Sequence, residues 1–245
     1  MILFVFEGKR EEKWFHAVNH YFLNNEVLEY FVVGSTFHTL YKELKDNEWD
    51  IIGALQQMEK ERGERKLRDY KSSDFAEVYL FFDYDPHSRK ESLTELNDEL
   101  HQMLVFFDDE TDNGKLYVNY PMVEAIRYTK ELPDLEYYKY SVPLEDCDSF
   151  KESAAEFSYY SGTTFVTSRG QGKDRETKDN WIMLKNQNAA KANFICCGDN
   201  CLPVSKSDIE QKKILESQVT KYVFSDKPEV SILSGISVFL YDYLK

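Results

Sequence analysis

The sequence contains no hydrophobic run long enough to cross a bilayer. Its apolar runs, such as Ile2 to Phe6, are far shorter than the roughly 20 residues that a transmembrane helix needs. A secretory signal needs a basic start and a longer apolar stretch, whereas Ile2 to Phe6 leads directly into Glu7. We therefore expect a soluble protein of the cytoplasm, without a membrane partner.

Cysteine is also scarce. The chain has four, at Cys147, Cys196, Cys197 and Cys201, and they do not form a pair of Cys-x-x-Cys units. A zinc site at the last three remains an alternative. Reduced thiols in an intracellular protein are the simpler interpretation.

Basic residues are fewer than acidic ones, 30 against 44, and the formal net charge is −14. A chain with this balance does not coat nucleic acid by bulk electrostatic attraction. Hydrophobic residues nevertheless make up 42 % of the sequence and aromatic residues 15 %. That is enough for a packed core, which excludes a disordered protein.

Short apolar runs alternate with helix-like patterns over residues 1–130. We expect strands at Ile2–Phe6, Tyr30–Val33, Val78–Phe82 and Leu116–Asn119. We expect helices at Arg10–Leu23, Thr36–Leu44 and Ser92–Val105, and a further one beginning at Pro121, with a less regular insertion at about residues 46–76. This alternation predicts an α/β, Rossmann-like core with a mostly parallel sheet.

Residues 131–245 show a weaker pattern, and we expect them to form a largely helical C-terminal extension. Helical segments are predicted at Asn180–Ile195, Asp208–Val223 and Ile232–Leu244. Ser161–Lys178 is rich in Gly, Thr and Ser and is predicted to be a loop. No internal repeat is visible.

Carboxylates follow two of the predicted strands. Glu7 comes after the first strand, and Asp83 and Asp85 come after the third, on either side of one residue that would point the other way. Glu11 lies one helical turn beyond Glu7. Because ligands of such sheets bind beyond the carboxyl ends of the strands, the four acids are expected to converge, and a hard divalent cation would offset their repulsion. Asp-x-Asp alone is usually a solvated turn, but its occurrence together with Glu7 and Glu11 favours a Mg²⁺ or Mn²⁺ site.

Two stretches carry a resemblance to a known family. Phe4-Val5-Phe6-Glu7-Gly8-Lys9-Arg10-Glu11, followed by Leu80-Phe81-Phe82-Asp83-Tyr84-Asp85, resembles the TOPRIM domain of topoisomerases, bacterial primases and OLD-type nucleases. The resemblance covers about residues 1–130. Gly114–Glu124 and the tail near Ser231–Leu244 look like segments of small TOPRIM proteins from phage-defence and abortive-infection loci.

This resemblance implies that Glu7 is a metal ligand or general base and that Glu11, Asp83 and Asp85 hold metal. Proteins of this kind often act with a partner ATPase. Topoisomerases also need a nucleophilic Tyr in a separate domain, and primases need a zinc domain. A chain of 245 residues leaves little room for either, so a hydrolytic nuclease acting on DNA or RNA in anti-phage defence is the expected function.

Further candidates are less specific. Glu124 would lie in the first turn of the helix beginning at Pro121, aimed at the same edge or merely complementing the helix dipole. OLD-type sites also use a lysine. Lys191 is predicted to share a helix face with apolar and amide side chains. It could act in catalysis, or its aliphatic stem could pack against that face while its amine extends to solvent. His87, just beyond Asp85, could ligate metal or carry protons, or be a bystander. Basic residues of the predicted loop could grip phosphates or be solvated: Arg169, Lys173, Arg175 and Lys178.

Two other functions stay open. The protein could be a non-catalytic TOPRIM-fold subunit that acts by binding a partner ATPase. It could also be a phosphoryl-transfer domain like the response regulators or haloacid dehalogenases, although those need an Asp where this chain has Glu7.

Overall fold

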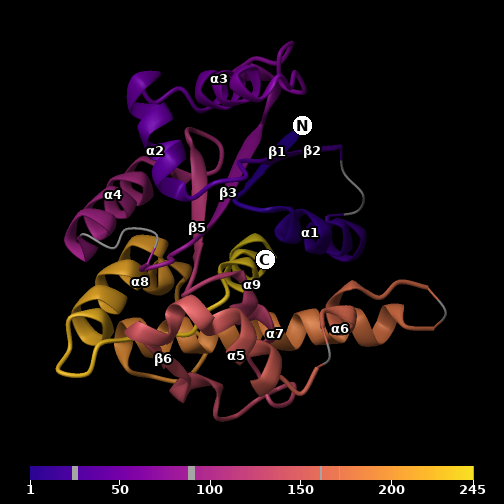
Figure 1. The fold of residues 1–245 in the computed structure, drawn as a ribbon. Coiled ribbons are helices and arrows are strands. Elements are labelled where there is room, and N and C mark those ends of the chain that lie inside the picture. Colours follow the sequence, from indigo (N-terminus) through magenta and orange to yellow (C-terminus); the bar gives the residue numbers. More distant parts are fainter. Residues whose placement is uncertain (24–26, 88–91, 161, 171, 245) are drawn as a thin grey trace.

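Four parallel strands and one short antiparallel strand form the central sheet (Figure 1). The structure, a computed structural model, describes residues 1–23, 27–87, 92–160, 162–170 and 172–244. The strand order is β2-β1-β3-β5-β4, and only β4 runs antiparallel to its neighbour. The strands are β1 (Ile2–Phe6), β2 (Leu28–Val32), β3 (Glu77–Asp83), β4 (Asp108–Asp109) and β5 (Gly114–Asn119). The predicted α/β fold with a mostly parallel sheet is confirmed.

Helices surround this sheet and make up most of the second half of the chain. The α-helices are α1 (Lys9–Phe22), α2 (Phe37–Asp46), α3 (Ile51–Arg62), α4 (Leu93–Phe106), α5 (Phe150–Phe157), α6 (Thr164–Thr167), α7 (Asp174–Cys197), α8 (Gln211–Gln218) and α9 (Gly235–Tyr243). Short 3₁₀ helices span Ser72–Asp74, Val123–Arg127, Tyr137–Lys139, Leu144–Ser149 and Lys206–Ile209, and a π-helical turn spans Val219–Val223. A separate two-stranded sheet joins β6 (Ser141–Pro143) to β7 (Glu229–Ser231). No helix among the described residues is both long and apolar enough to cross a membrane.

Three local predictions were wrong. The helix expected at Pro121 is a 3₁₀ helix that begins at Val123. Pro121 lies in a bend, where its carbonyl accepts from the amide of Asp85, and Tyr120 exchanges two backbone hydrogen bonds with Leu233. Within residues 46–76, α3 is a regular helix that buries one face and ends at Gly63 in a left-handed conformation. The loop predicted at Ser161–Lys178 contains α6 and the first turn of α7, while Ser161 itself lies outside the described residues.

Aromatic rings fill one face of the sheet. Phe4 of β1 and Phe81 of β3 lie under Phe15 of α1, with ring centroids 4.8 and 4.7 Å away. Phe239 of α9 covers the same two rings at 5.9 and 5.4 Å, edge-on. Helices α1 and α9 therefore cover this face together, and such aromatic pairs add to the free energy of burial.

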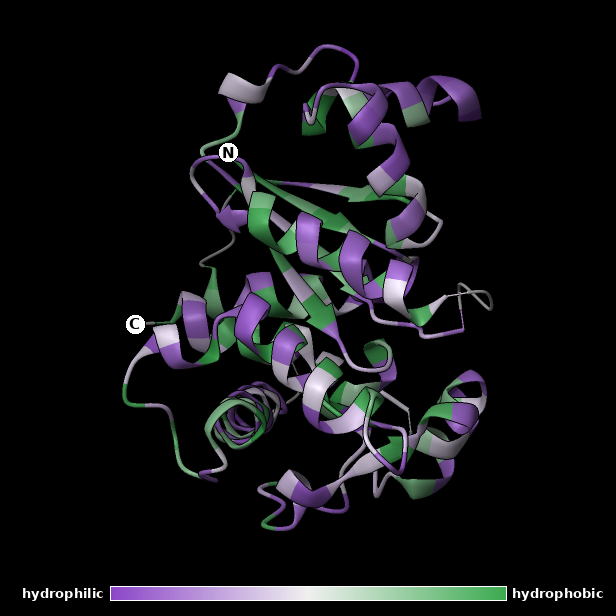
Figure 2. Cartoon of the chain, turned by 90° about the vertical axis from the view of Figure 1, so that its left-hand side faces the viewer, coloured by the Kyte–Doolittle hydropathy of each residue, from purple (hydrophilic) through white to green (hydrophobic). Residues whose placement is uncertain are grey.

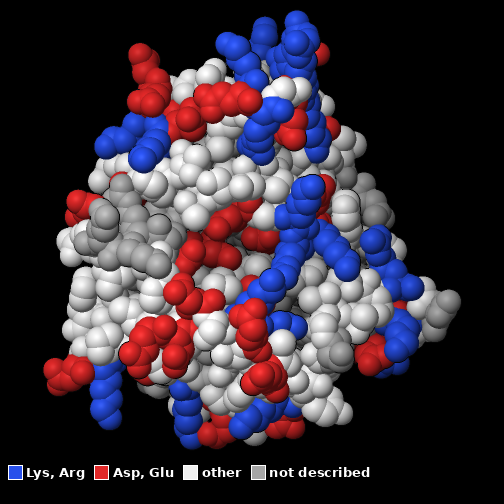
Figure 3. Space-filling view, in the orientation of Figure 1, with Lys and Arg blue, Asp and Glu red and all other residues white. Residues whose placement is uncertain are grey.

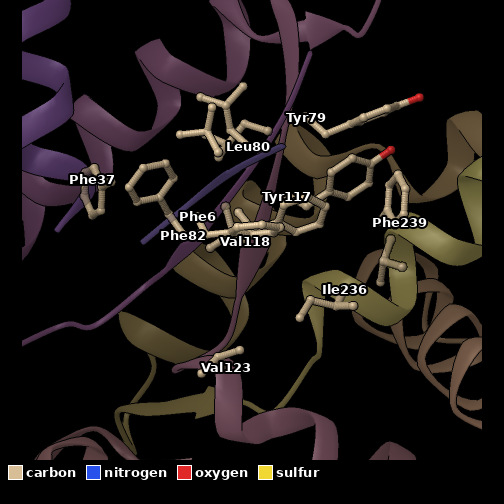
Figure 4. Packing of buried hydrophobic residues seen from close by; sticks show 14 of the residues in the cluster. Phe6, Phe37, Tyr79, Leu80, Phe82, Tyr117, Val118, Val123, Ile236 and Phe239 are labelled. Carbon is tan, nitrogen blue, oxygen red and sulfur yellow. The ribbon is translucent and has the colours of Figure 1, made fainter. Parts of the chain in front are cut away.

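The opposite face is covered by α2 and α4, with α8 beside α4 (Figure 1). In Figure 4, Phe37 of α2 lies on the side of Phe82, whereas Phe239 lies across the sheet against Tyr79 and Tyr117. Figure 2 shows the strands as mainly hydrophobic and the outer helix faces as hydrophilic. The two-sided cover explains why the strands read as continuous apolar runs.

We expect replacement of Phe239 by Ala to destabilise the whole domain, because the ring is fully buried between the sheet and α1. Removing a buried Phe typically costs about 3–5 kcal/mol of unfolding free energy. Urea denaturation would measure the loss. Phe224→Ala is the matched control: its side chain is 55 % exposed, and we expect a change within about 0.5 kcal/mol. Equal effects of the two variants would contradict the packing of α9 on the sheet.

Candidate functional site

Glu7 and Asp83 lie side by side at the carboxyl edge of the sheet. Strands β1 and β3 are parallel neighbours with Phe6 opposite Phe81. The backbone continues this pairing, since the amide of Glu7 donates to the carbonyl of Phe81 at 3.0 Å. The amide of Asp83 then donates to Oε2 of the Glu7 side chain at 3.0 Å. The expected parallel pairing and common edge are confirmed.

Asn119 holds the Asp83 carboxylate and was not identified from the sequence. It ends β5 directly opposite Asp83, and its Nδ2 donates to Asp83 Oδ1 at 3.1 Å. Its own Oδ1 accepts from the amide of Gly235 at 2.9 Å, so the start of α9 orients the amide group. Asn119 is completely buried. Its place at the end of a buried strand was the available signal.

Glu11 completes the inner group. It is 2 % exposed and lies in the first turn of α1, where hydrogen bonds from the backbone amides of Gly8 and Glu11 help to hold its carboxylate. A Cβ atom at Gly8 would lie 3.4 Å from Glu11 Oε2, in ordinary van der Waals contact, so Gly8 is directly beside this carboxylate. The predicted neighbourhood of Glu7 and Glu11 is present.

Asp85 reaches the edge by a route that differs from the predicted one. Tyr84 points into the core and donates to Asn97 Oδ1 at 2.9 Å, as alternation requires. Asp85 itself is not extended: its φ is 29°, in the left-handed region that Asp tolerates better than most residues. Its carboxylate accepts from the amide of His87 at 3.3 Å. It still lies close enough to raise the pKa of Glu7 and of Asp83.

Burial and mutual repulsion disfavour negative charge on these acids. Burial raises the pKa of Glu7 to about 9, with further contributions from Asp83 and Glu11. Burial, with the charge of Asp83, raises the pKa of Glu11 to about 8. Burial raises the pKa of Asp83 to about 7, opposed by the hydrogen bonds from Asn119 and Val123. Such a group of carboxylates calls for a positive counter-charge.

Arg10 supplies part of that charge and was also missed. Its guanidinium forms an ion pair with Glu124, which is 4 % exposed. The charge of Arg10 also lowers the pKa of Glu11 and of Asp83. Glu124 therefore joins the group through Arg10, from a 3₁₀ turn. The position of Arg10 between Glu7 and Glu11 in the sequence was the signal.

The donor chemistry of this edge fits a divalent cation. Oxygen from clustered carboxylates is what Mg²⁺ and Mn²⁺ prefer. Among the residues that the structure describes, however, no three His, Cys, Asp or Glu side chains are close enough to hold one ion in their present positions. Cation binding would thus require these side chains to close around the ion. Figure 3 shows acidic side chains gathered at the centre of this face with Lys and Arg beside them.

Lys191 has other partners. It is completely buried in α7, and its ammonium donates to the carbonyl of Tyr137 at 3.0 Å and to that of Tyr140. Its Nζ also lies 4.9 Å from the centre of the Tyr137 ring. Burial lowers its pKa well below the usual value, and the one carboxylate that counteracts this is Glu229. In this arrangement Lys191 ties α7 to the segment before β6.

The remaining candidates are exposed or have other hydrogen-bond partners. The exposed basic residues are divided between the turn before α7, with Arg169 and Lys173, and α7 itself, with Arg175 and Lys178. His87 Nε2 lies 2.7 Å from the carbonyl of Leu144. The four cysteines are free thiols: Cys147 is buried, Cys196 is half-buried, and Cys197 and Cys201 are exposed.

Comparison of this chain with protein-family models, with curated proteins and with solved structures finds no match.

The raised pKa of Glu7 gives a stability prediction with a definite sign. A carboxyl whose pKa is raised on folding stabilises the folded protein fully at a pH below its unfolded pKa of 4.5. That contribution to the free energy of unfolding is lost as the pH rises towards the folded pKa of about 9. Glu7→Gln cannot ionise, so in EDTA its melting temperature should increasingly exceed that of the wild type between pH 5 and 9. A pKa shift of one unit corresponds to about 1.4 kcal/mol of unfolding free energy, so even a fraction of the shift would change the melting temperature measurably. Mg²⁺ added at pH 8 should narrow the gap. A gap that is constant with pH would contradict the burial of a charged Glu7.

Proposed function

We propose that this protein is a Mg²⁺- or Mn²⁺-dependent nuclease that hydrolyses phosphodiester bonds of DNA or RNA. The observation that carries the proposal is the convergence of Glu7, Glu11, Asp83 and Asp85 at the carboxyl edge of a parallel sheet. Glu11 is buried and Glu7 and Asp83 are partly buried, and negative charge is disfavoured on all three, as is common at functional sites. The TOPRIM resemblance of the same residues supports this proposal.

Each residue has a distinct part in the proposed chemistry. Bound Mg²⁺ or Mn²⁺ would neutralise charge on the phosphate and lower the pKa of a bound water. Asp83, oriented by Asn119, and Asp85 would hold the cation, with Glu11 beside them. Glu7 would ligate the cation or accept the proton of the attacking water. Gly8, which lacks a side chain, leaves space for a phosphate next to Glu7.

Arg10 would then have two states. Without a cation its guanidinium is the counter-charge of the edge and pairs with Glu124. Its side chain is about half exposed, so it is free to turn towards a phosphate that approaches the edge. We also propose a role in anti-phage defence and a partner ATPase, on the TOPRIM resemblance alone, and a cytoplasmic location, on the short apolar runs of the sequence.

The test is incubation of the purified protein with plasmid DNA, total RNA and tRNA in Mg²⁺, Mn²⁺ or EDTA. We expect cleavage of at least one substrate in Mg²⁺ or Mn²⁺ and none in EDTA. Cleavage that persists in EDTA would contradict the proposal. Absence of cleavage, together with full biological effect of Glu7→Gln, would favour a non-catalytic subunit that acts through its partner.

A further inference from the structure

Helix α1 begins at the carboxylate edge and presents a basic face to solvent. Lys9, Lys13, His16 and His20 are all exposed. At 3.6 residues per turn they fall within about 60° of one another around the helix axis. Buried residues of α1, including Phe15 and Val18, occupy the opposite side. The four side chains form a row about 16 Å long, at a rise of about 1.5 Å per residue.

The far end of this row meets the turn between α6 and α7. The Tyr21 hydroxyl donates to the carbonyl of Ser168 at 2.8 Å and to Asp174 Oδ1 at 2.8 Å. Arg169 follows Ser168 directly and is exposed. Lys178 of α7 places its Nζ 5.8 Å from the centre of the Phe22 ring, at the end of α1. Arg169 and Lys178, from the second half of the chain, therefore lie close to Tyr21 and Phe22 at the carboxyl end of α1, beyond the end of the row.

Acidic residues compensate only part of this charge. Asp174 is engaged by Tyr21 and by the amide of Gly170, and Asp179 lies 3.8 Å from Arg175. Because Asp179 compensates its charge, Arg175 does not belong to the row. Among the described residues, no ion pair involves Lys9, Lys13 or Lys178. Figure 3 shows Lys and Arg side chains running from the central acidic group towards the side where α6 and α7 lie in Figure 1.

We propose that this row, from Lys9 through Lys13 to Arg169 and Lys178, binds the phosphate backbone of a single nucleic-acid strand and leads it to the carboxylate edge. The inference rests on the proposed nuclease function and names how its substrate is held. A row of flexible cations and imidazoles suits sequence-independent contact with phosphates. The local row also shows how a chain with a net charge of −14 can bind a polyanion.

The test compares two triple variants that remove the same charge. The row variant is Lys13→Gln, Arg169→Gln and Lys178→Gln. The control variant is Lys60→Gln, Arg65→Gln and Arg68→Gln, which changes exposed residues in and after α3. Fluorescence anisotropy in EDTA measures binding to a labelled 20-nucleotide DNA, the same RNA sequence and the corresponding duplex, at several salt concentrations. Circular dichroism confirms folding of each variant.

We expect the row variant to bind single strands roughly tenfold or more weakly than wild type, because it has lost contacts to phosphates. Each lost contact should also reduce the slope of log affinity against log salt concentration by about 0.7. The control variant should bind as wild type. Equal affinity of row and control variants, preference for the duplex, or no binding by wild type would each overturn the proposal. If the wild type binds single strands but cleaves no substrate, and the row variant does not bind, the role of the row would be supported and the proposed nuclease function would be contradicted.

Discussion

Glu7→Gln is expected to abolish Mg²⁺-dependent cleavage while leaving the fold intact. Gln has the shape of Glu and keeps an oxygen that can accept from the Asp83 amide, as Glu7 Oε2 does at 3.0 Å. It cannot ligate a cation as a carboxylate does or accept a proton from water. Loss of one group from a concerted site typically lowers kcat by orders of magnitude. Because Glu7 is partly buried and its pKa is raised to about 9, the Glu7→Gln variant should melt at the same or a higher temperature than wild type at pH 8 in EDTA.

Glu59→Gln is the matched control for this variant. Glu59 is also buried, at 2 % exposure, but lies in α3, where its two oxygens accept from the amides of Lys66 and Leu67 at 3.0 and 2.8 Å. Gln offers only one oxygen, so one of these amides loses its acceptor and the protein should melt lower. Its cleavage rate per folded molecule should be unchanged. If Glu7→Gln cleaved as wild type, Glu7 would have no part in the chemistry.

Asp83→Asn should remove the divalent cation. Asp83 lies at the centre of the group, next to Glu7 and held by Asn119, so it is the most fixed carboxylate of the edge. Loss of an outer partner of a metal ligand commonly costs about 10–100-fold in metal affinity. Loss of a direct, charged ligand should weaken Mn²⁺ binding by at least that factor in calorimetric titration at pH 8.

An exposed carboxylate gives the control. Asp98 lies on the outer side of α4, and Asp98→Asn removes the same charge from the protein. We expect its Mn²⁺ affinity to match that of the wild type. Equal weakening by both variants would mean that Mn²⁺ responds to the net charge of the surface and not to a site at the sheet edge.

Much of the core was predictable because its signals are local. The strand at Ile2–Phe6 is a continuous apolar run that ends at Glu7, and the one before Asp83 repeats this pattern. Parallel pairing then brings both ends to one edge without any long-range information. The positions of Glu7 and Asp83 followed from that rule, and the position of Glu11 followed from its offset of one helical turn from Glu7.

The parts that sequence patterns missed depend on contacts between distant segments. Asn119 has a role only because β5 pairs with β3 and α9 begins beside it. In the sequence, Lys191 is an unexpected charged residue on an apolar helix face. In the structure, it donates to backbone carbonyls about fifty positions earlier in the chain. The backbone of Asp85 is left-handed, and its amide donates to the carbonyl of Pro121, 36 positions further along the chain. Tertiary contacts of this kind leave no periodic trace in a sequence.

The most direct measurement of the central claim is anomalous diffraction from crystals soaked in Mn²⁺. The account predicts a manganese peak at the carboxyl edge of the sheet, within ligand distance of Glu7 and Asp83, that is absent from crystals of Asp83→Asn. Carboxylate oxygens that have closed around the ion would show the expected ligation. Wild-type crystals with no peak at this edge, or with manganese only at exposed acids elsewhere, would contradict it.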